Sequence, residues 1–117
     1  MTLWHESRGN GPDIVLLHGW GMNAAIWRNV ADELAKTHRV HLLELPGHGN
    51  SPYSGETTLT EWAQACIDAA PQRASWIGWS LGGQVALHAA QLSPQRVERL
   101  VLTAGSPRFV QADDWPN

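Results

Sequence analysis

A serine flanked by glycines is the residue of this sequence best placed for covalent chemistry. The stretch Gly78-Trp79-Ser80-Leu81-Gly82 fits the pattern G-x-S-x-G, in which a tight strand-to-helix turn exposes a serine hydroxyl at the top of a parallel sheet. We expect the glycines because strand and helix backbones nearly touch at such a turn and leave no room for a Cβ. The same pattern also arises by chance in turns without chemistry. The rest of the chain must therefore decide between a nucleophile and an inert turn.

Apolar patterning on both sides of this serine predicts alternating strands and helices. Continuous apolar runs are typical of strands buried on both faces of a sheet, and apolar residues at helical spacing predict amphipathic helices. The expected strands occupy 3–7, 13–17, 40–45, 76–77 and 97–103. The expected helices occupy 24–36, 59–70 and 81–92. This alternation predicts an α/β fold, a doubly wound and mostly parallel sheet with helices on both faces and an antiparallel edge strand at 3–7.

Local signals mark the ends and the buried faces of these helices. Asn23 is the expected N-cap of the first helix, and Thr58 or Thr60 that of the second, which Pro71 ends. We expect Cys66, on the apolar side of the second helix, to be a buried thiol. The apolar face of the first helix is expected to contain Trp27, Val30, Ala31 and Leu34.

Three loops follow the carboxyl ends of the expected strands. They are His18-Gly19-Trp20-Gly21, the turn-rich segment 46–51, and the turn at Ser80. Ligands of open parallel sheets bind beyond the carboxyl ends of the strands. We therefore expect the three loops to meet at one edge and to form the site.

In this order, the three loops resemble those of α/β-hydrolases of the serine esterase type. The resemblance implies that Ser80 is the catalytic nucleophile and that the backbone N–H groups of Trp20 and Leu81 form the oxyanion hole. It also implies that the Trp20 indole is a wall against the acyl chain. The sequence around Trp20 and around Trp79, with the ending 114–116, is similar to that of carboxylesterases that cleave the methyl ester of pimeloyl-acyl-carrier protein in biotin synthesis. This implies a carrier-bound acyl methyl ester as substrate, no cofactor, no metal, and a monomeric parent enzyme.

A serine nucleophile needs a histidine base, which in turn needs an acidic partner. In this family the histidine of the first loop is structural, so the resemblance gives His18 no role as base. His88 lies on the same helix as Ser80 and about 12 Å along it, which is out of reach. We expect His48 to be a rim residue. The family often has Asp where this chain has Glu44, and the sequence leaves open whether the longer side chain orders the following loop.

No complete triad is therefore expected within the 117 residues. The family places both the acid and the base after the serine. The acids available there are Glu98, at the far end of a strand, and Asp113 and Asp114, in a segment without periodic pattern. We therefore interpret 1–117 as a partial α/β-hydrolase domain without its lid and late strands. The alternatives are an esterase or thioesterase of broad short-chain specificity and, in another class, a catalytically incomplete binding fragment.

Composition narrows the remaining function classes. A net charge of −3, without a cluster of Lys or Arg, argues against nucleic-acid binding. No apolar run approaches the roughly 18 residues of a membrane span, and the first residues lack the pattern of a signal peptide. The single cysteine excludes an internal disulfide and indicates a cytoplasmic location. Seven tryptophans against one Phe and one Tyr suggest a ligand cleft.

Overall fold

A computed structural model describes residues 3–53, 55 and 58–103 of the chain. Five strands form one sheet in the order β1-β3-β2-β4-β5. The strands are β1 (His5–Arg8), β2 (Asp13–Leu17), β3 (Arg39–Leu43), β4 (Ala74–Trp79) and β5 (Val97–Thr103). The helices are α1 (Arg28–Leu34), α2 (Leu59–Ala69) and α3 (Leu81–Leu92), with short 3₁₀ helices η1 (Ala24–Trp27) and η2 (Pro94–Arg96).

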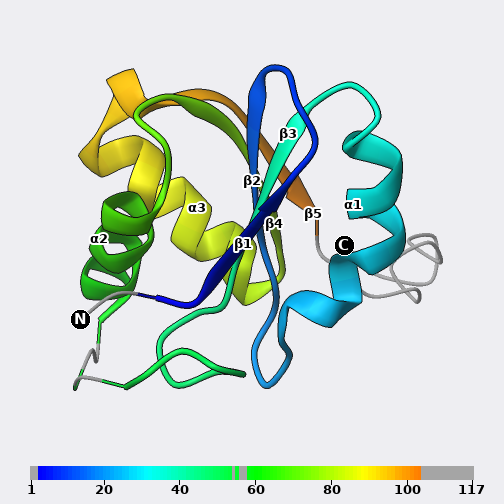
Figure 1. Ribbon diagram of the computed structural model, residues 1–117. Coiled ribbons are helices and arrows are strands. Elements are labelled where there is room, and N and C mark those ends of the chain that lie inside the picture. The colour runs from blue at the N-terminus through cyan, green and yellow to red at the C-terminus, as the bar shows by residue number, and fades with distance from the viewer. Residues whose placement is uncertain (1–2, 54, 56–57, 104–117) are drawn as a thin grey trace, which may run out of the picture.

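The sheet is parallel from β3 to β5 and has one antiparallel edge. Strand β2 pairs in parallel with both β3 and β4, and β4 pairs in parallel with β5. Strand β1 lies antiparallel to β3 at the edge, with Ser7 opposite His41. Helices α2 and α3 cover one face of the sheet and α1 covers the other (Figure 1). The predicted α/β architecture, including the antiparallel edge, is confirmed.

Alternate residues of β2 supply two separate cores, one on each face of the sheet. Val15 and Leu17 pack with residues of α2 and α3, whereas Ile14 and Leu16 pack with η1 and α1. Burial on both faces is the reason for the unbroken apolar run in this strand. Cys66 of α2 is fully buried in the first core, as expected.

The helix expected at 24–36 differs from the prediction. It begins as η1, where the Asn23 side chain accepts a hydrogen bond from the Ala25 N–H at 2.9 Å, and continues as α1 only to Leu34. A 3₁₀ turn holds about three residues against 3.6 in an α-helix, so the junction rotates the following residues. Val30, expected on the buried face, is therefore 43% exposed.

The other two helices agree more closely with their sequence signals. Thr58, rather than Thr60, caps α2: its hydroxyl accepts from the Glu61 N–H at 3.1 Å, and the Glu61 carboxylate accepts from the Thr58 N–H at 3.1 Å. This is a capping box. Helix α3 runs from Leu81 to Leu92, as predicted. Its first residue follows Ser80 directly.

Candidate active site

Ser80 occupies a strained turn between the end of β4 and the start of α3. Its backbone has φ 58° and ψ −117°, and it is the one non-glycine residue with positive φ in the described part of the chain. Such a conformation costs roughly 1–3 kcal/mol and persists only where the surroundings enforce it. Serine at a helix N-cap ordinarily bonds back to the helix, but the Ser80 side chain makes no such bond. The exposed hydroxyl is therefore left available to a ligand.

Two glycines allow the close approach that enforces this turn. A Cβ on Gly78 would collide with the backbone of Gly82 and Gly83, and one on Gly82 would collide with the carbonyl oxygens of Leu17 and His18. The expected reason for the glycines, contact between backbones, is therefore confirmed. It also shows that the first turn of α3 packs directly on the end of β2.

The loop after β2 reaches Ser80. A Cβ built on Gly19 would lie 3.5 Å from the Ser80 Cβ and 3.3 Å from the Trp79 carbonyl oxygen. Trp20 follows Gly19, and Leu81 follows Ser80. In the described residues, neither the Trp20 nor the Leu81 backbone N–H donates to a protein acceptor. The partial positive charge at the start of α3 favours an anion at the same place.

The first turn of α3 and the edge strand β5 both hold Ser80. Its carbonyl oxygen accepts from the N–H groups of Gly83 at 2.8 Å and Gln84 at 3.2 Å. Its own N–H donates to the Thr103 carbonyl oxygen at 2.9 Å, at the end of β5. Both backbone polar groups of Ser80 are therefore engaged, which leaves its side chain as the free reactive group.

His18 is a structural residue in this geometry. It is fully buried; its Nε2 accepts from the Leu45 N–H at 3.0 Å, which leaves the ring proton on Nδ1, 2.7 Å from the Gly19 carbonyl oxygen. Burial is the largest influence on this ring and lowers its pKa, against the opposing effect of the bond to the Gly19 carbonyl oxygen. A neutral ring with both nitrogens bonded to backbone cannot serve as a base for Ser80.

His48 is more than the rim residue that we expected. Its Nε2 accepts from the Gly21 N–H at 2.9 Å, and its Nδ1 lies 3.1 Å from the Pro46 carbonyl oxygen. The first bond requires a bare Nε2, so the proton sits on Nδ1 and donates to Pro46. His48 therefore ties the loop after β3 to the residue that follows Trp20.

Glu44 joins the loop after β2 to the loop after β3. The sequence left open whether its side chain orders the second of these loops. Glu44 is 4% exposed, and its carboxylate accepts from the Ala24 N–H at 3.0 Å and the Asn50 N–H at 2.7 Å. A Cβ on Gly49 would collide with this carboxylate. The longer side chain thus orders the loop at 46–51 together with the start of η1.

Aromatic side chains line the hollow beside this site. The Trp20 ring is 70% exposed and stacks on Trp62 of α2, with centroids 6.3 Å apart and planes at 16°. His48 meets both rings edge-on, at 5.2 Å from Trp20 and 5.8 Å from Trp62. A hollow of about 320 Å³ is lined by these rings together with Pro46, Gly47 and Tyr53. No signal in the sequence marked Trp62 as part of this wall, because its partner Trp20 lies on a distant loop.

Among the described residues, none is positioned to act as general base or acid for the Ser80 hydroxyl. No imidazole or carboxylate among them bonds to its hydroxyl; His88 bonds through Nδ1 to the Gln84 carbonyl oxygen of its own helix at 3.1 Å. Glu98 lies near the start of β5, 3.9 Å from Arg73. Asp113 and Asp114 lie outside the described residues. Within the same part of the chain, no three His, Cys, Asp or Glu side chains are grouped to hold a metal, and no helix is long and apolar enough to cross a membrane.

Comparisons with known proteins show the family to which the chain belongs. A family described as the alpha/beta hydrolase fold matches residues 12–117. The chain is 47% identical over 114 residues to a pimeloyl-[acyl-carrier protein] methyl ester esterase of Vibrio campbellii, covering 97% of this chain and 45% of that protein. It is 46% identical over 116 residues to the protein of the same name from Methylococcus capsulatus, covering 99% and 46%. The chain thus spans about half the length of the curated relatives it matches.

Solved structures of hydrolases and esterases are similar to this fold. A hydrolase from Pseudomonas aeruginosa is 30% identical with a TM-score of 0.78, covering 96% of this chain and 46% of the other. A thermophilic esterase from Thermogutta terrifontis is 26% identical with a TM-score of 0.79, covering 93% and 44%.

Proposed function

The chain belongs to the α/β-hydrolase family, and from that premise we propose that it is part of a serine carboxylesterase that cleaves the methyl ester of pimeloyl-acyl-carrier protein. The proposed assignments are Ser80 as nucleophile, and Trp20 and Leu81 as donors to the oxyanion. The observation that supports them best is the backbone of Ser80, strained at φ 58° beside two N–H groups that bond to no described residue. Relatives of 46–47% identity that carry this esterase name support the substrate.

The proposed reaction is acyl transfer in two steps. Ser80 Oγ attacks the ester carbonyl carbon, its proton passes to a base, and methanol leaves with that proton; water then releases the free acid. We assign the base to none of the described residues. Charge on the carbonyl oxygen develops where the Trp20 and Leu81 N–H groups and the start of α3 attract it. Loss of one such donor typically raises the barrier by about 3–4 kcal/mol.

The aromatic hollow is the proposed seat of the acyl chain. Its walls are Trp20, Trp62 and the ring of His48, next to Leu81. Stacked tryptophans bury methylene groups well, at about 0.8 kcal/mol for each CH₂ removed from water. We further propose that the enzyme is cytoplasmic, because the free Cys66 suits a reducing compartment, and that it acts as a monomer without a cofactor.

A fluorophosphonate probe tests the nucleophile. We expect stoichiometric labelling that maps to Ser80, is lost in Ser80→Ala, and persists in Ser93→Ala, a matched change at the C-cap of α3. Absence of labelling at Ser80 in a demonstrably folded chain would instead favour the catalytically incomplete binding fragment. For the substrate, hydrolysis of a carrier-bound pimeloyl methyl ester is compared with that of p-nitrophenyl acetate and a short acyl thioester. Turnover of the small substrates alone would reject the pimeloyl assignment in favour of a broad esterase or thioesterase.

A further inference from the structure

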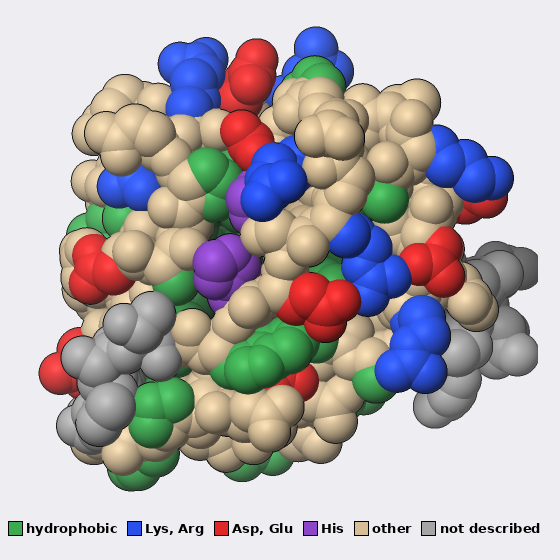
Figure 2. Space-filling view, viewed as in Figure 1, with side chains coloured by type: hydrophobic (Ala, Val, Ile, Leu, Met, Phe, Trp, Pro, Cys, Tyr) green, Lys and Arg blue, Asp and Glu red, His purple; other side chains and the backbone are tan. Residues whose placement is uncertain are grey.

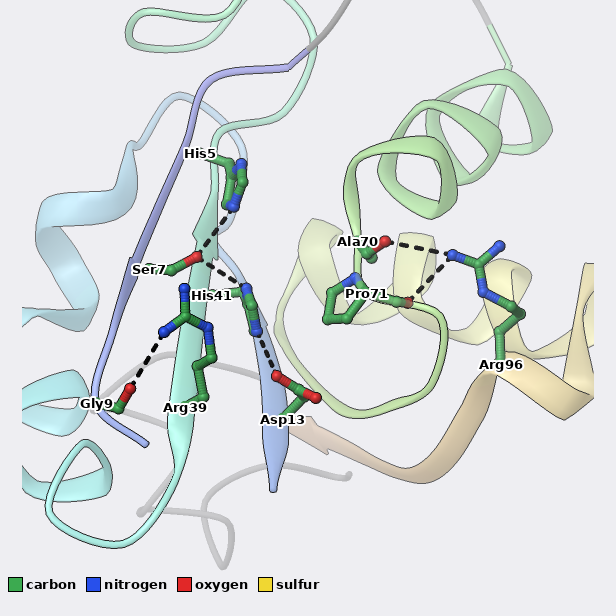
Figure 3. A network of polar contacts seen from close by, with 9 residues as sticks. All are labelled: His5, Ser7, Gly9, Asp13, Arg39, His41, Ala70, Pro71 and Arg96. Carbon is green, nitrogen blue, oxygen red and sulfur yellow. Dashed lines mark hydrogen bonds and ion pairs between the residues drawn. The ribbon is translucent and has the colours of Figure 1, made fainter. Parts of the chain in front are cut away.

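A second group of serine, histidine and aspartate side chains lies across β1, β3 and β2, on the side of the sheet away from β5. Ser7 Oγ is 2.9 Å from His41 Nδ1, and His41 Nε2 is 2.7 Å from Asp13 Oδ1. His5 Nε2 lies 3.0 Å from the same Ser7 oxygen. Figure 3 shows the four side chains as one continuous line of contacts that runs from β1 across β3 to β2.

The register of the sheet assembles this group from three separate strands. Ser7 of β1 is opposite His41 of β3, which in turn pairs with Val15 of β2. Asp13 stands two residues before Val15 and so points to the same face of the sheet. His5 stands two residues before Ser7 and points there too. The group is therefore fixed by backbone pairing rather than by a loop.

The hydrogen bonds can run in one consistent direction. The Asp13 carboxylate accepts the His41 Nε2–H, so a neutral His41 presents Nδ1 as an acceptor to the Ser7 O–H. The Ser7 oxygen then accepts from the His5 Nε2–H. A serine whose proton faces an imidazole that is held by a carboxylate is the arrangement that activates a hydroxyl. In the described residues, Ser7 has such partners and Ser80 does not.

Burial and charge support a working relay. The His41 side chain is 8% exposed, whereas that of Asp13 is 35% exposed and His5 is exposed. Figure 2 shows histidine side chains open to solvent on this face, next to Lys or Arg side chains. Burial is the main cause that lowers the pKa of His5, and the positive charge of Arg39 lowers it further, which favours the neutral ring. Asp13 is the carboxylate that balances His41 when that ring takes up a proton.

We propose that Ser7 is a second nucleophile, activated by His41 and Asp13, that accepts acyl groups from small activated esters. Ser7 Oγ attacks the carbonyl carbon while its proton passes to His41 Nδ1. The bond to the aryloxide then breaks, and the aryloxide leaves with the electron pair. His41 releases the proton to solvent or to the leaving group, and the product is O-acyl Ser7. Because Ser7 is only partly exposed, we expect small donors with good leaving groups, such as aryl acetates.

The test uses p-nitrophenyl acetate on the full chain with Ser80→Ala, which removes the proposed esterase nucleophile. Trypsin releases residues 1–8, with Ser7 next to the carboxyl-terminal Arg8, so fragment ions separate acetyl-Ser7 from acetylation of the N-terminus. Residues 74–96 of the same digest contain Ser75 and Ser93, which bond to no histidine in the described structure and serve as internal controls. Asp13→Asn, added to this chain, removes the carboxylate but keeps the shape.

We expect Ser7 to be acetylated at least tenfold faster than Ser93, because a positioned base contributes about 10²-fold or more. Asp13→Asn should lower the Ser7 rate tenfold or more and leave that of Ser93 unchanged. Equal rates at Ser7 and Ser93 would overturn the proposal, and so would an unchanged Ser7 rate in a folded Asp13→Asn chain. If Asp13→Asn does not fold, the ratio of Ser7 to Ser93 in the Ser80→Ala chain decides alone. Failure here leaves the assignment of Ser80 untouched, because Ser80 is absent from the assay.

Discussion

Replacement of Glu44 by Gln should destabilise the protein far more than its mild chemistry suggests. Glu44 is 4% exposed, and each carboxylate oxygen accepts one backbone N–H, from Ala24 at 3.0 Å and from Asn50 at 2.7 Å. Gln has one oxygen, so its NH₂ group must face one of these two donors, of which that of Ala24 is buried and that of Asn50 is part-buried. A lost hydrogen bond to a charged group is worth about 1.5–3 kcal/mol, and an unsatisfied buried donor adds to this. We expect a loss of about 2–4 kcal/mol in the free energy of unfolding.

Urea denaturation followed by tryptophan fluorescence measures this loss. With a slope of about 2 kcal/mol per molar urea for a small protein, the midpoint should fall by roughly 1–2 M. The matched control is Glu33→Gln: Glu33 is exposed and pairs at 3.2 Å with Lys36, which lies just beyond the end of α1, and such a pair is worth about 0.5 kcal/mol or less. If the midpoints of the two variants agree within error, the reasoning about the Glu44 carboxylate is wrong.

Three further predictions address burial and close packing. Burial lowers the pKa of His18 below the 6.5 of an unfolded chain, so between the two pKa values the unfolded state binds a proton that the folded state does not. The contribution of His18 to the free energy of unfolding should therefore be fully present above pH 6.5. It should be lost below pH 6.5, by up to about 1.4 kcal/mol per pH unit. Urea midpoints from pH 7.5 to 5 check this, and His18→Gln should flatten the profile. Cys66 is fully buried, which raises its thiol pKa, so Ellman's reagent should react with it only after denaturation; rapid reaction of the native chain would contradict this. Gly82→Ala places a Cβ against two carbonyl oxygens and should cost about 1–3 kcal/mol or more, whereas in Gly83→Ala the nearest atom is 3.2 Å away, so its urea midpoint should change less.

Local signals were sufficient to predict most of the fold. The spacing of apolar residues placed α3 correctly from Leu81 to Leu92, and Thr58 proved to be the cap of α2. The prediction that Val30 lies on the buried face was wrong, because apolar periodicity assumes one continuous helix, whereas a 3₁₀ turn precedes α1. Helix ends and caps, which depend on nearby residues, could be predicted in this chain. The change from a 3₁₀ helix to an α-helix within one segment could not.

The candidate site was predictable only in part. The glycines on both sides of Ser80 predicted its turn, because backbones can come this close only where a residue has no Cβ. The bond between His48 and the Gly21 N–H was not predictable, since it joins loops that follow two different strands. The line from Ser7 to Asp13 was missed for the same reason. It depends on the pairing register of three strands, which apolar patterns do not specify.

The hydrogen bond from the Ser80 N–H to the Thr103 carbonyl oxygen has a mechanical consequence. Thr103 is the last residue of β5, a strand with one free edge in the described sheet and with Val101 and Leu102 about half exposed. If the end of β5 moved away, Ser80 would lose the acceptor of its own amide, and its positive φ would lose one of its constraints. The backbone conformation of Ser80 therefore depends partly on the position of β5. Whatever packs on β5 acts, through one backbone contact, on the conformation of the serine.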